Sequence, residues 1–308
     1  MKPILQRAVS EALGAAITGS RPLSGGDINQ AYAISLSDGR RFFVKANDRA
    51  PLDMFEGEAH GLQWLAESET LRVPAVETLG QVVHGPAFLV LELLEPGARR
   101  GDYHEELGRG LAALHRSGAP DVGLDRDNYI ATLVQPNQPP GGQQGRSGDE
   151  SPAGQTPGSS TRWAEFYATC RLMPMVARAI DRGVAPRAWV GDFDRLYARL
   201  DELVGPDEPP ARLHGDLWSG NLHVAPDGRP CLIDPAVYGG HREIDLAMLE
   251  LFGSPPSRFW AAYDEAHPLA PGRDERVALY QLYPLLVHVN LFGGSYVGSV
   301  ESALGRYR

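Results

Sequence analysis

The sequence predicts an α+β protein with two lobes: a small antiparallel β-sheet with one main helix in residues 1–95, then a larger, mostly helical lobe in residues 96–308. Strand-like alternation dominates the first part of the chain, and helical spacing dominates the rest. The breaker sequence Glu95-Pro96-Gly97 separates the two parts and is expected to be a hinge. A chain of 308 residues that is 43% hydrophobic can bury a substantial core.

The first lobe is expected to hold five strands and two helices. Residues 3–13 have helical spacing and predict a short opening helix, and residues 21–26 predict a turn. Apolar residues at helical intervals in residues 53–68 predict the main helix. Ser37-Asp38-Gly39 is a hairpin signal between two strands. The strands that can be delimited are residues 30–36, 41–45, 73–79 and 88–93.

Helices dominate the second lobe. Pro174 and Pro284 fall inside two of them and are expected to mark kinks or helix boundaries. Residues 138–161 are rich in Gly, Pro, Ser and Gln, so they predict a disordered surface insertion, although a functional lid is the alternative. The helices are expected at residues 107–117, 163–182, 193–203, 243–252, 257–266 and 274–292.

Composition excludes several classes of protein. The net charge of -10 and the lack of a Lys/Arg run argue against nucleic-acid binding. The amino terminus has no apolar signal core and no run of eighteen apolar residues occurs, so we expect a cytoplasmic protein without a membrane span. Cys170 and Cys231 are far apart and outside any CxxC pattern. They are interpreted as small core residues in a reducing compartment, which excludes a thiolate zinc site.

The run HGDLWSGNL (residues 214–222), followed by Ile233-Asp234-Pro235, has the residues that phosphoryl transfer from a nucleotide requires. Asp216 can accept the proton of an attacking hydroxyl, while Asn221 and Asp234 can hold magnesium ions on the phosphates. Short strands at residues 222–224 and 231–233 would place both metal-ligand candidates at strand ends. Either fragment alone could be an ordinary turn, but the two at this spacing favour a phosphotransferase site.

The first lobe supplies matching groups for the nucleotide. Gly25, Gly26 and Asn29 lie in a turn whose N–H groups could contact phosphate, and Lys45 ends a run on the next strand. Paired glycines in a hairpin are often only structural, and no GK[ST] follows, so this is not a Walker A loop. We choose Glu58 rather than Glu56 as the partner of Lys45, because Glu58 directly precedes an apolar stripe; either glutamate could also be a solvated helix charge.

Two further residues are expected to support the HGDLWSGNL run of residues 214–222, called here the catalytic loop. His214 could be a base, but a position two residues before the proton acceptor favours a role in pinning the loop through backbone contacts. Asp245 could accept N–H bonds from the catalytic loop, although charge stabilisation of a helix start would also explain it.

These residues resemble the fructosamine kinase family, also called ketosamine-3-kinases, within the bilobal protein-kinase-like group that includes aminoglycoside and choline kinases. HGD alone would indicate only the superfamily, whereas LWSGN (residues 217–221) and IDPAVYGG (residues 233–240) indicate this branch. The similarity covers nearly the whole chain. Other similar stretches are residues 25–29, 43–45, 55–59, 127–130, 163–166 and 283–293.

The resemblance implies ATP-dependent phosphorylation of the 3-hydroxyl of a ketosamine, a sugar linked to the amine of an amino acid or of a protein lysine. Phosphorylation makes the adduct labile, and elimination releases the amine, so the implied role is deglycation repair. By motif, Asp216 would be the base and Asn221 and Asp234 the magnesium ligands. Lys45 and Glu58 would position phosphate. Glu92 to Leu94 would form the adenine-binding hinge.

Some features of the acceptor site stay open. Trp218 could be an aromatic platform for the sugar or a core residue covering the loop, and His288 could reach in from the late helix or be a core histidine. Family members with a cysteine in the glycine loop can form redox-linked dimers, but this chain has Asp27 there. The competing functions are a kinase of the same fold for an aminoglycoside or amino-alcohol, and a catalytically silent nucleotide-binding module. The number of subunits is undetermined.

Overall fold

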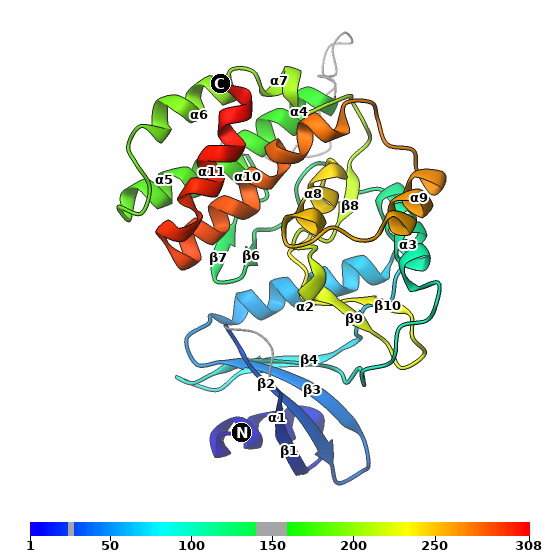
Figure 1. The fold of residues 1–308 in the computed structure, drawn as a ribbon. Helices are drawn as coiled ribbons and strands as arrows, with labels where there is room; N and C mark the ends of the chain where they lie inside the picture. The colour runs from blue at the N-terminus through cyan, green and yellow to red at the C-terminus, as the bar shows by residue number, and fades with distance from the viewer. Residues whose placement is uncertain (24–27, 140–158) are drawn as a thin grey trace, which may run out of the picture.

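The computed structural model describes residues 1–23, 28–139 and 159–308. A five-stranded antiparallel sheet lies at one end of the molecule and most helices lie at the other (Figure 1). The strand order is β1-β2-β3-β5-β4. The strands are β1 Ile17–Leu23, β2 Gln30–Leu36, β3 Arg41–Asn47, β4 Val76–Gln81 and β5 Ala87–Glu92, and the helices of this part are α1 Pro3–Leu13 and α2 Leu52–Ala66.

Alternation along β3 decides which face of the sheet carries the chemistry. Phe42 and Val44 pack with residues of α1 on one face, whereas Phe43 packs with residues of α2 on the other. Because side chains alternate along a strand, Lys45 and Asn47 share the α2 face with Phe43. The sheet therefore presents Lys45 to α2.

The helical part is built around two apolar clusters, one between α3 and α9 and one among α4, α5, α6, α10 and α11. Its helices are α3 Tyr103–Ser117, α4 Ser159–Phe166, a π-helix Tyr167–Leu172, α5 Met173–Asp181, α6 Trp189–Tyr197, α7 Leu200–Leu203, α8 Glu243–Leu251, α9 Ser257–Ala266, α10 Arg273–Phe292 and α11 Val297–Leu304. There are also three two-stranded antiparallel sheets: β6 Asn128–Ile130 with β7 Leu133–Gln135, β8 Ala211–Leu213 with β11 Tyr238–Gly240, and β9 Leu222–Val224 with β10 Pro230–Leu232.

Most predicted elements are confirmed, with some corrections. Residues 21–23, predicted as a turn, end β1, an edge strand whose largely exposed side chains give no hydrophobic alternation. Residues 193–203 fall in two helices rather than one. The sequence reasoning missed α11 and the strands β6, β7, β8 and β11; those strands are three residues long, too short to establish a period.

The predicted insertion at residues 138–161 falls largely outside the described residues, but α4 already begins at Ser159. Pro174 lies in the first turn of α5, directly after the π-helix, and Pro284 lies inside α10. Cys170 and Cys231 are buried free cysteines, as expected. The boundary at residue 95 stays a prediction.

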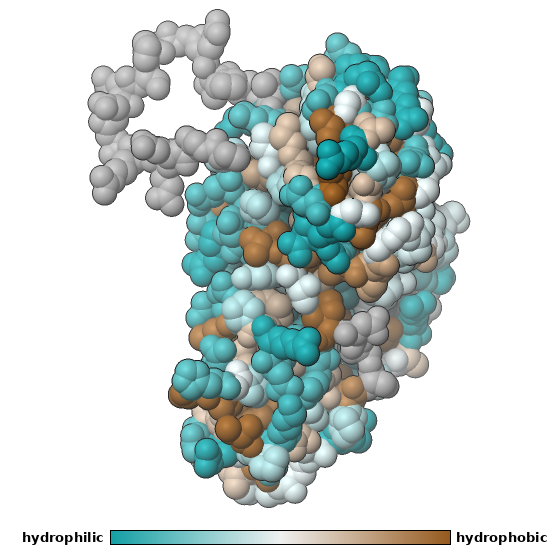
Figure 2. All heavy atoms as spheres, turned by 90° about the vertical axis from the view of Figure 1, so that its left-hand side faces the viewer, coloured by the Kyte–Doolittle hydropathy of each residue, from teal (hydrophilic) through white to brown (hydrophobic). Residues whose placement is uncertain are grey.

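Figure 2 shows one face of the molecule, on which hydrophobic residues form scattered patches among hydrophilic ones. In the described part of the chain, no helix combines the length and the apolar character that crossing a bilayer requires. The cytoplasmic location stays a prediction.

Two glycines let α2 lie close to β6 and to the segment that follows β10. A Cβ atom on Gly57 would lie 3.3 Å from the Cβ atom of Asn128, and one on Gly61 would lie 3.2 Å from Val237 and 3.6 Å from Pro235. Larger residues at these positions would push α2 away, and with it Glu58. The close contact thus sets the position of the helix that carries Glu58.

We predict that Gly61→Leu destabilises the protein by about 1–3 kcal/mol, because the new side chain overpacks against Val237. Gly191→Leu is the matched control, since Gly191 is an exposed glycine of α6 whose Cβ position meets only the Arg195 side chain, at 3.7 Å. The control should be neutral or stabilising, because leucine is the better helix former. Urea unfolding of both variants is the measurement, and equal effects would contradict the packing argument.

Candidate active site

A buried lysine joins three distant segments at the centre of the site. Lys45 Nζ lies 2.7 Å from Glu58 Oε1 on α2 and 2.7 Å from Asp234 Oδ1, which follows β10. The Lys45 side chain is 8% exposed and that of Glu58 13%, whereas Asp234 keeps 46% of its side chain exposed. The choice of Glu58 as the partner of Lys45 agrees with this geometry, and Asp234 still faces solvent.

Asn221 connects Asp216 to the backbone of Asp234. Its Nδ2 group donates to Asp216 Oδ2 at 3.0 Å and to the Asp216 carbonyl at 2.8 Å, with a longer contact of 3.4 Å to the Asp234 carbonyl. One continuous set of contacts therefore joins the residues predicted from the sequence, which are Asp216, Asn221, Asp234, Lys45 and Glu58.

Asp245 holds the catalytic loop by its backbone. The Asp245 carboxylate accepts the His214 N–H at 2.7 Å and the Gly215 N–H at 2.9 Å, and it also contacts His115 Nε2 at 3.3 Å. His115 Nδ1 in turn lies 2.7 Å from the hydroxyl of Tyr263 in α9. Asp245 thus makes the loop contacts that the sequence suggested, and the His115 and Tyr263 contacts behind it had no sequence signal.

The loop is also fastened to the segment around Asp234. His214 Nε2 lies 2.9 Å from the Ile233 carbonyl, and Ala236 N donates to the His214 carbonyl at 2.9 Å. Gly215 has φ +81°, and a Cβ atom on it would lie 1.9 Å from the Ala236 carbonyl oxygen, so only glycine fits. Asp234 itself has φ +53°, a left-handed conformation that aspartate tolerates better than most residues.

Burial adjusts the protonation of these groups. The pKa of Asp216 is raised to about 7, chiefly by desolvation and further by the charges of Asp234 and Asp245. Burial alone would lower the pKa of Lys45, but Glu58 and Asp234 outweigh it and raise that pKa. Burial lowers the pKa of His214, so its imidazole is neutral and suited to the structural contacts above.

The predicted nucleotide-binding residues are placed unequally. Gly25 and Gly26 lie outside the described residues. Asn29 Oδ1 accepts a bond of 2.9 Å from Asn47 Nδ2, which also donates to the Ile28 carbonyl. Sequence reasoning missed Asn47, although its position two residues after Lys45 places it on the same face of β3.

The proposed adenine hinge lies directly after β5. The Glu92 side chain is engaged by Arg72 and by the Ala75 N–H, and the Glu92 N–H donates to the Ala75 carbonyl at 2.8 Å. Leu94 lies in the coil that follows. Gly97 N donates to the Val224 carbonyl at 2.9 Å, which ties this coil to β9.

Trp218 is exposed rather than part of the core. Its side chain is 37% exposed, and its ring occupies the space where a Cβ atom on Gly220 would lie, 2.3 Å from the nearest ring carbon. The Trp218 ring also meets the Phe252 ring edge-on at 5.8 Å, and Phe252 contacts the His288 ring at 5.0 Å. The two predicted substrate residues therefore meet through Phe252, which the sequence reasoning missed.

Two oxygen donors of the site suit a magnesium ion. Because the Asn221 amide nitrogen is directed at Asp216, the amide oxygen is the atom left for a cation. Asp234 uses Oδ1 for Lys45 and is half exposed, so Oδ2 remains available. In nucleotide sites Mg²⁺ binds one or two such oxygen ligands together with phosphate oxygens and water, so the residues present fit this ion.

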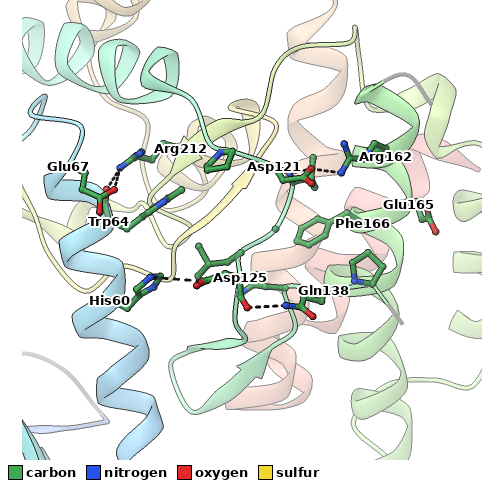
Figure 3. A pocket seen from close by; sticks show the side chains of 16 residues that line it. His60, Trp64, Glu67, Asp121, Asp125, Gln138, Arg162, Glu165, Phe166 and Arg212 are labelled. Atoms are coloured by element: carbon green, nitrogen blue, oxygen red, sulfur yellow. Dashed lines mark hydrogen bonds and ion pairs between the residues drawn. The ribbon is translucent and has the colours of Figure 1, made fainter. Parts of the chain in front are cut away.

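A cavity of about 830 Å³ lies elsewhere, beside the opposite face of α2. Figure 3 shows His60 of α2 directed at Asp125, and Trp64 of α2 lying beside Arg212. None of the residues grouped around Lys45 lines this cavity, so it is distinct from the candidate active site.

Comparison with known proteins agrees with this geometry. A family profile described as fructosamine kinase matches residues 1–141 and 151–307. The chain belongs to the fructosamine kinase family. It is 38% identical to a "probable ketoamine kinase" of Synechocystis sp. over 92% of this chain and 88% of the relative, and 35% identical to a chloroplastic protein-ribulosamine 3-kinase of Oryza sativa subsp. indica over 99% and 83%.

A crystal structure from Thermobifida fusca assigned to a fructosamine-3-kinase superposes with a TM-score of 0.81 at 37% identity, covering 98% of both chains. The expected α+β, protein-kinase-like fold is thereby confirmed, and so is a phosphotransferase activity toward a hydroxyl group. Use of ATP as phosphoryl donor follows from membership of this kinase family.

We predict that Asp245→Asn destabilises this fructosamine kinase by about 2–3 kcal/mol. In the variant, the NH₂ group of the amide would face a backbone N–H that donates to a carboxylate oxygen in the wild type. Activity should fall more than stability, since the loop carries Asp216. Thermal unfolding and kcat/KM are the measurements, and Asp194→Asn, an exposed site in α6, is the control. Unchanged stability in Asp245→Asn would contradict the anchoring role.

We further predict that kcat/KM falls as the pH drops below about 7, by about tenfold per pH unit, because protonated Asp216 cannot accept a proton. His214 should not produce this limb, because burial lowers its pKa below the ordinary value. Steady-state rates over roughly pH 5.5–9 test this, with circular dichroism to exclude acid unfolding. A profile that is flat through neutrality would contradict the raised pKa of Asp216.

Proposed function

We propose that the protein is an ATP-dependent ketosamine kinase that phosphorylates the 3-hydroxyl of a sugar attached to an amine. The observation that carries this proposal is the chain of contacts that links Asp216 through Asn221 to Asp234 and from Asp234 to one buried ammonium, Lys45. Relatives across the whole chain are described as ketoamine and ribulosamine kinases, which supports the acceptor class. The 3-phosphate would then be eliminated with release of the amine, so the reaction would reverse glycation.

Asp216 would act as the general base. Its carboxylate takes the proton of the 3-hydroxyl as the oxygen forms a bond to the γ-phosphorus and the bond to the leaving ADP oxygen breaks. The Asn221 amide fixes the orientation of this carboxylate through the 3.0 Å bond to Oδ2. A pKa near 7 places the base where proton transfer at neutral pH is efficient.

Lys45 and Glu58 would position the α- and β-phosphates, with Asn29, Gly25 and Gly26 covering them and the backbone of residues 92–94 receiving the adenine. Asn221 Oδ1 and Asp234 Oδ2 would hold magnesium. When bound, the ion supplies positive charge that offsets the charge of the phosphates. Without a cation the site holds Glu58, Asp216 and Asp234 against the single ammonium of Lys45, so negative charge is in excess.

A kinase of the same fold for an aminoglycoside or amino-alcohol is the second candidate. The net charge of -10 would suit a cationic acceptor, but a ketosamine also carries an amine and is compatible with the same charge. The family profile and the ketoamine and ribulosamine relatives favour the ketosamine.

The experiment is ADP release from purified enzyme supplied separately with ribuloselysine, fructoselysine and kanamycin. We expect turnover of at least one ketosamine and none of kanamycin. In Asp216→Asn turnover should fall by about 10³-fold or more while ATP binding survives, because only the base is lost. Turnover of kanamycin alone would replace the proposal by the second candidate, and a near-normal rate in Asp216→Asn would remove Asp216 as the base.

A further inference from the structure

Exposed aromatic side chains gather in one place on the described surface. The aromatic residues more than a third exposed are Trp218 at 37%, Phe252 at 40% and Phe292 at 55%, within residues 1–23, 28–139 and 162–308. Scattered exposed apolar residues need no explanation, whereas a contiguous patch indicates an interaction site. These three belong to one connected run of rings.

The run consists of Trp218, Phe252, His288, Phe292 and Tyr296, and is called here the aromatic run. Successive ring centroids lie 5.8 Å apart from Trp218 to Phe252 and 5.0 Å from Phe252 to His288. From His288 the next rings lie at 4.9 Å (Tyr296) and 5.5 Å (Phe292). The rings come from the catalytic loop, the end of α8, the end of α10 and the turn after it, so distant parts of the chain converge on this surface.

The backbone holds the rings of Trp218 and His288 in place. Gly220 leaves the space that the Trp218 indole fills, and any larger residue would displace it. His288 Nδ1 lies 2.7 Å from the Pro284 carbonyl, which orients the imidazole between Phe252 and Tyr296. Both residues are fixed rather than free to collapse onto the surface.

We infer that the aromatic run binds the amine substituent of the acceptor and so selects ketosamines whose amine carries an extended apolar chain. This inference rests on the proposed function. In a ketosamine only C2 separates C3, whose hydroxyl reacts at Asp216, from C1, which carries the nitrogen. The substituent therefore leaves the sugar close to Asp216, and Trp218 is only two residues away.

The position of the phosphate-binding groups supports this occupant. Asn221, Asp234 and Lys45 occupy the side of Asp216 where the phosphates would bind, so the substituent has to leave on another side. Trp218 can receive the protonated secondary amine by a cation–π contact. Phe252, Phe292 and Tyr296 then offer further apolar surface along the run, which suits a chain such as the methylenes of a lysine side chain.

The test compares two ketosamines of one sugar, made from methylamine and from n-hexylamine, which carry the same charge and differ only in apolar length. The wild-type enzyme should favour the hexylamine adduct by at least about tenfold in kcat/KM, the effect of removing two methylene groups from water. The difference should reside mainly in KM, because the chain touches no reacting atom.

Phe292→Ala should reduce this preference by about threefold or more, and Phe292→Leu should retain most of it, since apolar surface is restored. Val190→Ala is the control, because Val190 is 52% exposed on α6 and lies outside the aromatic run; it should keep the full preference. Equal kcat/KM for both adducts in the wild type, or an unchanged preference in Phe292→Ala, would overturn the inference and leave the proposed function standing. Failure to phosphorylate either adduct would overturn the inference, and the proposed function would fall with it only if ribuloselysine and fructoselysine are not turned over either.

Discussion

The arrangement of the site depends on the ammonium group of Lys45. An unpaired charge in a buried position costs several kcal/mol, so Lys45 requires carboxylates close by. One is Glu58, 13 residues further along the chain, and the other is Asp234, 189 residues further. The need to pair a single cation therefore joins β3, α2 and the segment after β10, and these are the elements that form the two sides of the site.

The same site is rigid on the side of the catalytic loop because backbone groups, rather than side chains alone, carry the contacts. Asp245 accepts two consecutive N–H groups, and Gly215 lies so close to the Ala236 carbonyl that no side chain could be accommodated. A base must be held within a fraction of an ångström of its proton donor to be effective. Asp216 is thus placed by the loop backbone on one side and by the Asn221 amide on the other.

Much of this site could be predicted because its residues lie in short motifs whose spacing reflects one chemistry. Asp216, Asn221 and Asp234 fall in two nearby runs, and Lys45 with Glu58 follows from strand and helix periodicity. The residues that were missed act through tertiary contacts. His115 and Tyr263 reach Asp245 from α3 and α9, and Phe252 meets Trp218 only after the chain has folded. The missed strands β6, β7, β8 and β11 are too short to show a period, and the equally short β9 and β10 were expected only because a hairpin turn signal lies between them.

Two kinds of contact hold α2 in its position. Glu58 already contacts Lys45, and Gly57 and Gly61 bring α2 against Asn128 and the Pro235–Val237 segment. Moving α2 outward would leave a buried ammonium short of one carboxylate and would open this packed contact at the same time, so both effects oppose the motion. The catalytic arrangement is therefore built into the fold, and selection among substrates has to act at the acceptor side, where the exposed rings lie.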